Sequence, residues 1–105
     1  MKLFEIRMKV APGPDAPPGV TETFACCFAS AADYGQAVGN ALGYARDSGV
    51  EVLDVLSPVR ELEPERWGEY VAVTWPEYAA NLPTQAEIGA LVESQSLFFS
   101  PFVAL

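Results

Sequence analysis

Hydrophobic and charged residues alternate at the start of the chain. The charged side chains lie between apolar ones that occupy every second position, namely Phe4, Ile6, Met8 and Val10. Such alternation is typical of a strand with one buried face, so the pattern predicts a β-strand over residues 2–10. Four prolines and two glycines follow within residues 11–19. They predict a long hairpin loop, because proline cannot donate a backbone hydrogen bond.

A second alternating run predicts a β-strand over residues 20–29. One of its faces carries only small side chains, those of Thr21, Thr23, Ala25, Cys27 and Ala29. Small side chains let another layer come close to the sheet. The sequence leaves open whether that layer is a helix or a second subunit.

The helical spacing of apolar residues predicts an α-helix over residues 31–48. Ser30 and Asp33 have the spacing of a capping box at its start, and Gly49 can adopt the left-handed conformation past its end. Each glycine inside a helix costs about 1 kcal/mol relative to alanine. We expect a close contact, within the subunit or with another one, to offset the cost of three glycines spaced by four: Gly35, Gly39 and Gly43.

Residues 50–59 predict a strand whose apolar positions shift phase near its middle. This shift indicates either burial on both faces or a β-bulge, and Pro58 indicates the end of regular pairing or an edge. Residues 69–75 are rich in β-forming residue types and also predict a strand. The segment 77–82 fits a helix or a loop equally well.

The strongest local signal is the capping box formed by Thr84 and Glu87, which predicts a helix over residues 84–96. An aromatic-rich strand is predicted over residues 97–104, where Pro101 indicates an edge position or a bulge.

The order of these elements is β-α-β-β-α-β with one additional N-terminal strand, within a single domain over residues 1–105. This order resembles the ferredoxin-like superfold, an α+β two-layer sandwich. Right-handed crossovers would then place both helices on one face of the sheet. The other face would be open and apolar, from which we expect a homodimer. The superfold hosts unrelated activities, so the resemblance predicts no function.

The chain carries six basic and fourteen acidic residues, a formal net charge of −8. This charge disfavours nucleic acids and anionic membranes as partners, and it permits a basic protein partner. The sequence contains no histidine, which excludes Ser–His and Cys–His nucleophile pairs within one chain. No loop has the spacing of a calcium-binding EF-hand, and the sequence predicts no metal and no cofactor.

Two adjacent cysteines, Cys26 and Cys27, are the only ones in the chain. On a strand they point to opposite faces, so they are not expected to form a disulfide. We expect them to be buried packing residues, and the alternative is a reactive thiol near the first helix. The chain start does not resemble a signal peptide and no stretch is long enough to span a membrane, so the sequence predicts a cytoplasmic protein.

Aromatic residues in acidic surroundings form a further candidate site, a binding surface that includes Trp67, Trp75 and Tyr78. The alternative is that Trp67 folds back onto the core. From these features the sequence favours a non-enzymatic, self-associating interaction module, for example an inhibitor or immunity-type partner of a basic protein. The second hypothesis is a small-molecule-binding or enzymatic domain. Its pocket would lie between helices and sheet or at a dimer seam, lined by Tyr34, Phe28, Trp75 and Phe99.

Overall fold

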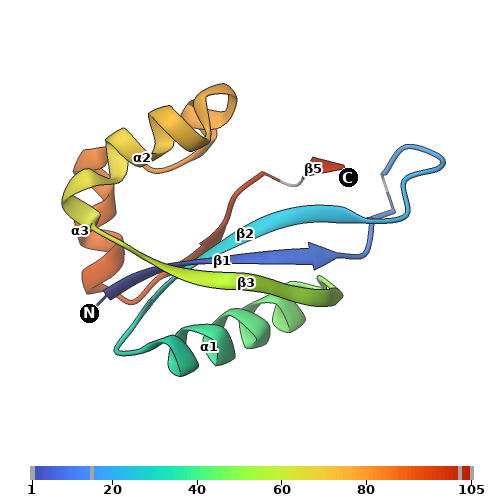
Figure 1. The fold of residues 1–105 in the computed structure, drawn as a ribbon, viewed down its shortest axis with the longest axis horizontal. Helices are drawn as coiled ribbons and strands as arrows, with labels where there is room; N and C mark the ends of the chain where they lie inside the picture. The colour runs from blue at the N-terminus through green and yellow to red at the C-terminus, as the bar shows by residue number, and fades with distance from the viewer. Residues whose placement is uncertain (1, 15, 102, 105) are drawn as a thin grey trace.

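The computed structural model describes residues 2–14, 16–101 and 103–104 of the 105-residue chain. Figure 1 shows the fold along the chain. The strands are β1 (Lys2–Val10), β2 (Thr23–Ala31), β3 (Val52–Leu62), β4 (Leu97–Phe99) and β5 (Val103–Ala104). The α-helices are α1 (Tyr34–Asp47), α2 (Trp67–Thr74) and α3 (Gln85–Glu93). Two 3-10 helices, Pro64–Arg66 and Pro76–Asn81, flank α2, and the second one covers most of the ambiguous segment 77–82.

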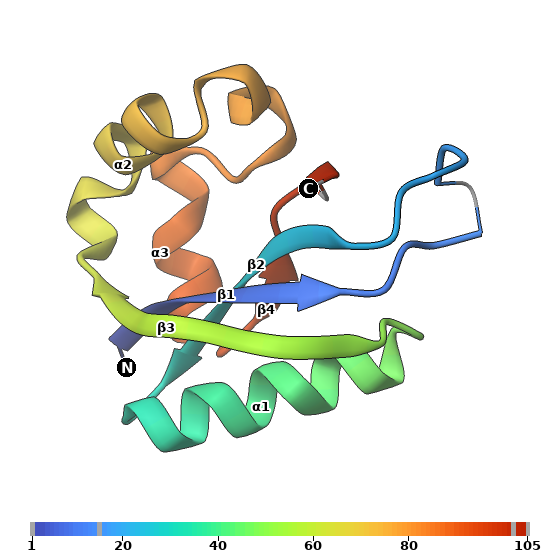
Figure 2. The ribbon, with the colours of Figure 1, turned by 45° about the vertical axis from the view of Figure 1, so that its right-hand side comes forward.

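All strand pairs in the sheet are antiparallel, in the order β3-β1-β2-β4, and β5 pairs with β2 beyond β4. Helix α1 lies against one face of the sheet, while α2 and α3 lie against the other (Figures 1 and 2). The result is a mixed α+β fold in three layers, in which β1 and β2 form a hairpin at the centre of the sheet.

The predicted ferredoxin-like, two-layer topology is wrong. The first two strands pair directly with each other, and β3 joins the outer edge of β1 only after α1. Because helices cover both faces, the described residues form no open apolar sheet face of the kind expected. An open sheet face therefore gives no reason to expect a homodimer.

The strand predicted over residues 69–75 is instead α2 (Trp67–Thr74) with its C-cap Trp75. Trp67, Val71 and Trp75 are spaced by four residues, and all three are buried. The β-forming residue types of this run favour a strand only weakly, because strand propensity depends strongly on context. Burial of one face of the helix outweighs this weak strand propensity.

Two separate cores flank the sheet. The α1 core contains Phe4, Ile6, Met8, Val10, Cys27, Ala29, Ala31, Ala37 and Ala41. Helix α1 thus packs against the small residues of β2, which is one of the two predicted alternatives. The α2/α3 core contains Leu3, Cys26, Phe28, Trp67, Val71, Trp75, Leu82, Ile88 and Val92. The face of β1 that carries its charged residues is therefore partly covered by helices.

The boundaries of β1 agree with the prediction, but the hairpin loop continues past residue 19, because β2 begins at Thr23 and runs to Ala31. Ser30 belongs to this strand, in register with Leu3, so it does not cap α1. Asp33 is the N-cap instead, and its Oδ1 accepts a hydrogen bond of 2.9 Å from the backbone N–H of Gln36. The left-handed conformation predicted for Gly49 is confirmed by its φ of 78°.

The third strand runs over Val52–Leu62 rather than residues 50–59, and its two register shifts against β1 fit the bulge that was one of the two predicted alternatives. It is an edge strand, as Pro58 indicated. The capping box of Thr84 and Glu87 is confirmed at the start of α3, which ends at Glu93 rather than residue 96. The last predicted strand is divided into β4 and β5, on either side of Pro101.

Candidate functional site

Three charged residues on β1, Glu5, Arg7 and Lys9, face the α2 side of the sheet, because strand side chains alternate between faces. Neighbouring strands add to this row through their register: Arg60 of β3 lies opposite Glu5, and Cys26 of β2 lies opposite Arg7. These residues are separated by up to 55 positions in sequence. Only the antiparallel pairing of the three strands brings them together.

A cavity of about 270 Å³ lies where the C-terminal end of α2 approaches this row. The strands contribute three charged groups and two neutral side chains, and α2 with its C-cap contributes two more. The lining residues are Glu5, Arg7, Phe24, Cys26, Arg60, Thr74 and Trp75. A concave site with apolar walls and a few converging polar groups has the general character of a small-molecule site.

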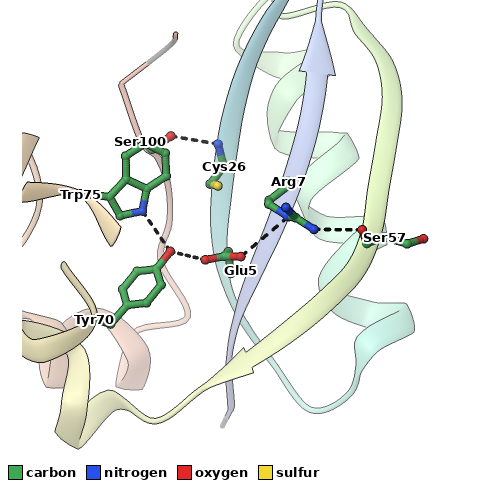
Figure 3. A network of polar contacts seen from close by, with 7 residues as sticks. All are labelled: Glu5, Arg7, Cys26, Ser57, Tyr70, Trp75 and Ser100. Atoms are coloured by element: carbon green, nitrogen blue, oxygen red, sulfur yellow. Dashed lines mark hydrogen bonds and ion pairs between the residues drawn. The ribbon is translucent and has the colours of Figure 1, made fainter. Parts of the chain in front are cut away.

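One wall of the cavity is a buried hydrogen-bond network (Figure 3). The Tyr70 hydroxyl donates to Oε2 of Glu5, and the indole Nε1–H of Trp75 donates to the Tyr70 oxygen over 3.0 Å. Glu5 is only 3% exposed, so its carboxylate depends on these partners. Burial, followed by the hydrogen bond to Glu5, raises the pKa of Tyr70 above its ordinary value, which keeps the hydroxyl protonated and donating.

The two guanidinium groups of the cavity have donors to spare. The Nη2 of Arg7 donates to the Ser57 carbonyl oxygen over 2.9 Å. Its Nε lies 4.0 Å from Oε1 of Glu5 and is buried without a hydrogen-bond partner among the described residues. The Arg60 side chain is exposed, and within the described ranges it makes no ion pair and no hydrogen bond. Each guanidinium presents several N–H donors in a planar fork.

The two thiols lie on opposite faces of β2, as the strand geometry predicts: Cys26 borders the cavity and Cys27 belongs to the α1 core. Burial raises the pKa of Cys26 to about 12, with the Glu5 carboxylate adding to the effect. Burial alone raises the pKa of Cys27 to about 12. A nucleophilic cysteine needs a lowered pKa and access to solvent, and neither side chain has these properties.

The aromatic candidates for a binding surface occupy different environments. Trp67 is 1% exposed, donates its indole N–H to the Pro83 carbonyl over 2.7 Å, and packs edge-on against Phe28. It folds back onto the core, as the alternative interpretation stated. Trp75 borders the cavity, and Tyr78 is half-buried beside it with ring centroids 6.1 Å apart.

The glycines of α1 are not in close contact with the sheet. Ala37, Ala41 and Ala45 fill that role and are fully buried. Gly35 and Gly39 are exposed, and a Cβ atom built on Gly39 would meet nothing within 4 Å. Close packing within the subunit is therefore the wrong explanation for this row of glycines. Self-association through it stays a prediction.

The pocket predicted to gather four aromatic side chains does not form. Tyr34 and Phe99 pack on the α1 side, against Phe4 and Tyr44. Phe28 and Trp75 lie on the α2 side of the sheet. Only Trp75 of the predicted set borders the cavity between the sheet and α2.

The sequence did not point to Glu5, Arg7 and Thr74, which line the cavity, or to Tyr70, which donates a hydrogen bond to Glu5. The sequence interpretation treated the charged face of β1 as solvated. One signal was available: Leu3 interrupts the charged face, and the structure shows that it is buried beneath α2 and α3.

A scan against protein-family models finds no match, and neither the curated proteins nor the solved structures contain a significant match. In the part of the chain that the structure describes, no three His, Cys, Asp or Glu side chains group as metal ligands would. The described helices are all too short or too polar to cross a membrane.

Proposed function

We propose that this domain binds a small organic molecule in the cavity between the sheet and the end of α2. The observation that carries the proposal is the buried network of Glu5, Tyr70 and Trp75 at the wall of a cavity that two arginines also line. A buried carboxylate costs free energy unless it is well hydrogen-bonded, and an apolar residue would serve the fold at least as well. Polar groups held in place beside a cavity are typical of ligand sites.

The protonation states favour binding over catalysis. Tyr70 and Cys26, two uncharged ionisable groups near Glu5, have raised pKa values and hold their protons at neutral pH. Neither is suited to act as a base or a nucleophile there, because a proton-transfer group works best with a pKa near the working pH. The chain also contains no histidine to take that role.

The proposal can be tested with a panel of small fragments, including anionic, neutral and cationic members, and ligand-observed NMR. Thr74→Phe places a ring in the cavity from an exposed position, so it should abolish fragment binding. Val73→Phe is the matched control, because Val73 is the preceding residue, is 79% exposed and does not line this cavity. Fragment contacts that persist in Thr74→Phe, or an absence of contacts in the wild type, would refute the proposal.

A second candidate function is self-association through the outer face of α1. Its support is that three glycines there cost about 3 kcal/mol relative to alanine, while Gly39 has no intramolecular neighbour to justify it. Leu42, 40% exposed, adds an apolar side chain on α1. Sedimentation should show a dimer that Gly39→Leu converts to a folded monomer, and a wild type that stays monomeric at high concentration would exclude this function.

A further inference from the structure

The charges that line the cavity restrict the chemistry of a ligand there. Two guanidinium groups, of Arg7 and Arg60, face one carboxylate, that of Glu5. The lining therefore has an excess of one positive charge within a chain whose formal net charge is −8. Low-dielectric walls strengthen the effect of such a local charge.

The negative group of the cavity is already engaged. Glu5 accepts a hydrogen bond from Tyr70, faces Arg7 and is 3% exposed. A cationic ligand would have to compete with these partners for the carboxylate. It would also lie beside two cations of the same sign.

The positive groups, in contrast, have unused capacity. The Nε of Arg7 is buried beside Glu5 and out of reach of a ligand, and one Nη2–H is bonded to Ser57, but Nη1 has no hydrogen-bond partner among the described residues. The Arg60 guanidinium has no polar partner in the part of the chain that the structure describes. A guanidinium fork matches the two oxygens of a carboxylate, and such charge-assisted bonds are stronger than neutral ones.

The remaining walls favour an apolar body on the ligand. The indole of Trp75 and the ring of Phe24 both line the cavity, and Phe24 also packs against the α2/α3 core. We propose that the ligand is a small organic carboxylate, held at its anionic end by Arg7 and Arg60 and packed at its apolar end against Trp75 and Phe24. This inference rests on the proposed small-molecule-binding function.

Three probes of matched shape separate the inference from the proposed function: benzoate, benzamide and benzamidine. The readout is the indole N–H signals in a ¹H–¹⁵N spectrum of the whole chain, which contains two tryptophans. Trp75 lines the cavity, whereas the Trp67 indole is buried against Pro83 and serves as an internal control. Benzoate should shift the Trp75 signal with saturation, and benzamide and benzamidine should bind at least about tenfold more weakly.

Arg60→Gln removes one of the two anion-binding groups from an exposed position, so the fold should be retained. Loss of a charge-assisted hydrogen bond should weaken benzoate binding about tenfold or more. Arg46→Gln is the control, because Arg46 is an exposed residue of α1, on the far side of the sheet. It should leave the affinity for benzoate unchanged.

Equal or tighter binding of benzamide or benzamidine would overturn the carboxylate inference and leave the small-molecule function standing. Retention of full benzoate affinity in Arg60→Gln would also overturn it. If none of the three probes shifts the Trp75 signal and the fragment panel gives no contacts, both proposals fail together.

Discussion

Replacing Tyr70 with phenylalanine tests the network that defines the candidate site. The change removes one hydroxyl, which donates to the Glu5 carboxylate and accepts from the Trp75 indole. A hydrogen bond to a charged group contributes about 1.5–3 kcal/mol, and a neutral one about 1 kcal/mol. Both partners are buried, at 3% and 7% exposure, so water cannot readily replace the hydroxyl. We expect Tyr70→Phe to lower the free energy of unfolding by about 3 kcal/mol.

Urea unfolding at neutral pH, followed by circular dichroism, measures this loss. It is a large fraction of the roughly 5–15 kcal/mol that stabilises a typical domain. Tyr44→Phe is the control, because Tyr44 is also half-buried but its hydroxyl makes no hydrogen bond among the described residues. It should cost less than about 1 kcal/mol. Equal losses in the two variants would refute the argument that Tyr70 supports a buried carboxylate.

A double variant separates the roles of the hydroxyl and the carboxylate. Tyr70→Phe leaves Glu5 buried without its donor, whereas adding Glu5→Leu removes the carboxylate as well. Replacing both partners with apolar groups is often neutral or stabilising. The double variant should therefore recover stability relative to Tyr70→Phe alone while losing the ligand site. If it is less stable than Tyr70→Phe alone, Glu5 stabilises the fold in its own right.

Three further predictions concern the helix glycines and the thiols. Gly39→Ala should raise the free energy of unfolding by up to about 1 kcal/mol, because the new Cβ meets nothing; a loss measured by urea unfolding would mean that a contact outside the subunit uses this position. Cys26 and Cys27 should resist a colorimetric thiol reagent in the folded protein and react only in denaturant, since both are buried with raised pKa values; rapid labelling of either in the native state would contradict this. At high pH the unfolded chain releases these thiol protons first, so stability should be full below about pH 8.5 and fall as the pH rises toward 12. Cys27→Ala should reduce the fall in the urea midpoint between pH 7.5 and 10.5. An unchanged fall would show that the Cys27 thiol does not cause the loss of stability at high pH.

The elements that sequence analysis located are those with local signals. Alternation defined β1 to its observed ends, and the capping box placed the start of α3 at Thr84. The α1 start was misplaced because Ser30 and Asp33 both fit a cap. Pairing of Ser30 with Leu3 in the sheet, which is a long-range interaction, decided between them.

Tertiary packing explains the larger errors. Residues 69–75 have β-forming side chains, but the four-residue spacing of Trp67, Val71 and Trp75 is helical and includes a residue outside the predicted strand. The cavity could not be predicted from the sequence for a similar reason. Glu5 and Arg60 become neighbours only through the β1–β3 register, which shifts at two places, and no local pattern of these residues sets that register.

The Trp75 indole N–H signal during titration with small organic molecules tests the binding site most directly, because this indole is both a wall of the cavity and a member of the buried network. Our account predicts that benzoate moves this signal with saturation while the Trp67 signal stays in place. A Trp75 signal that does not respond to benzoate or to any member of the fragment panel would contradict it.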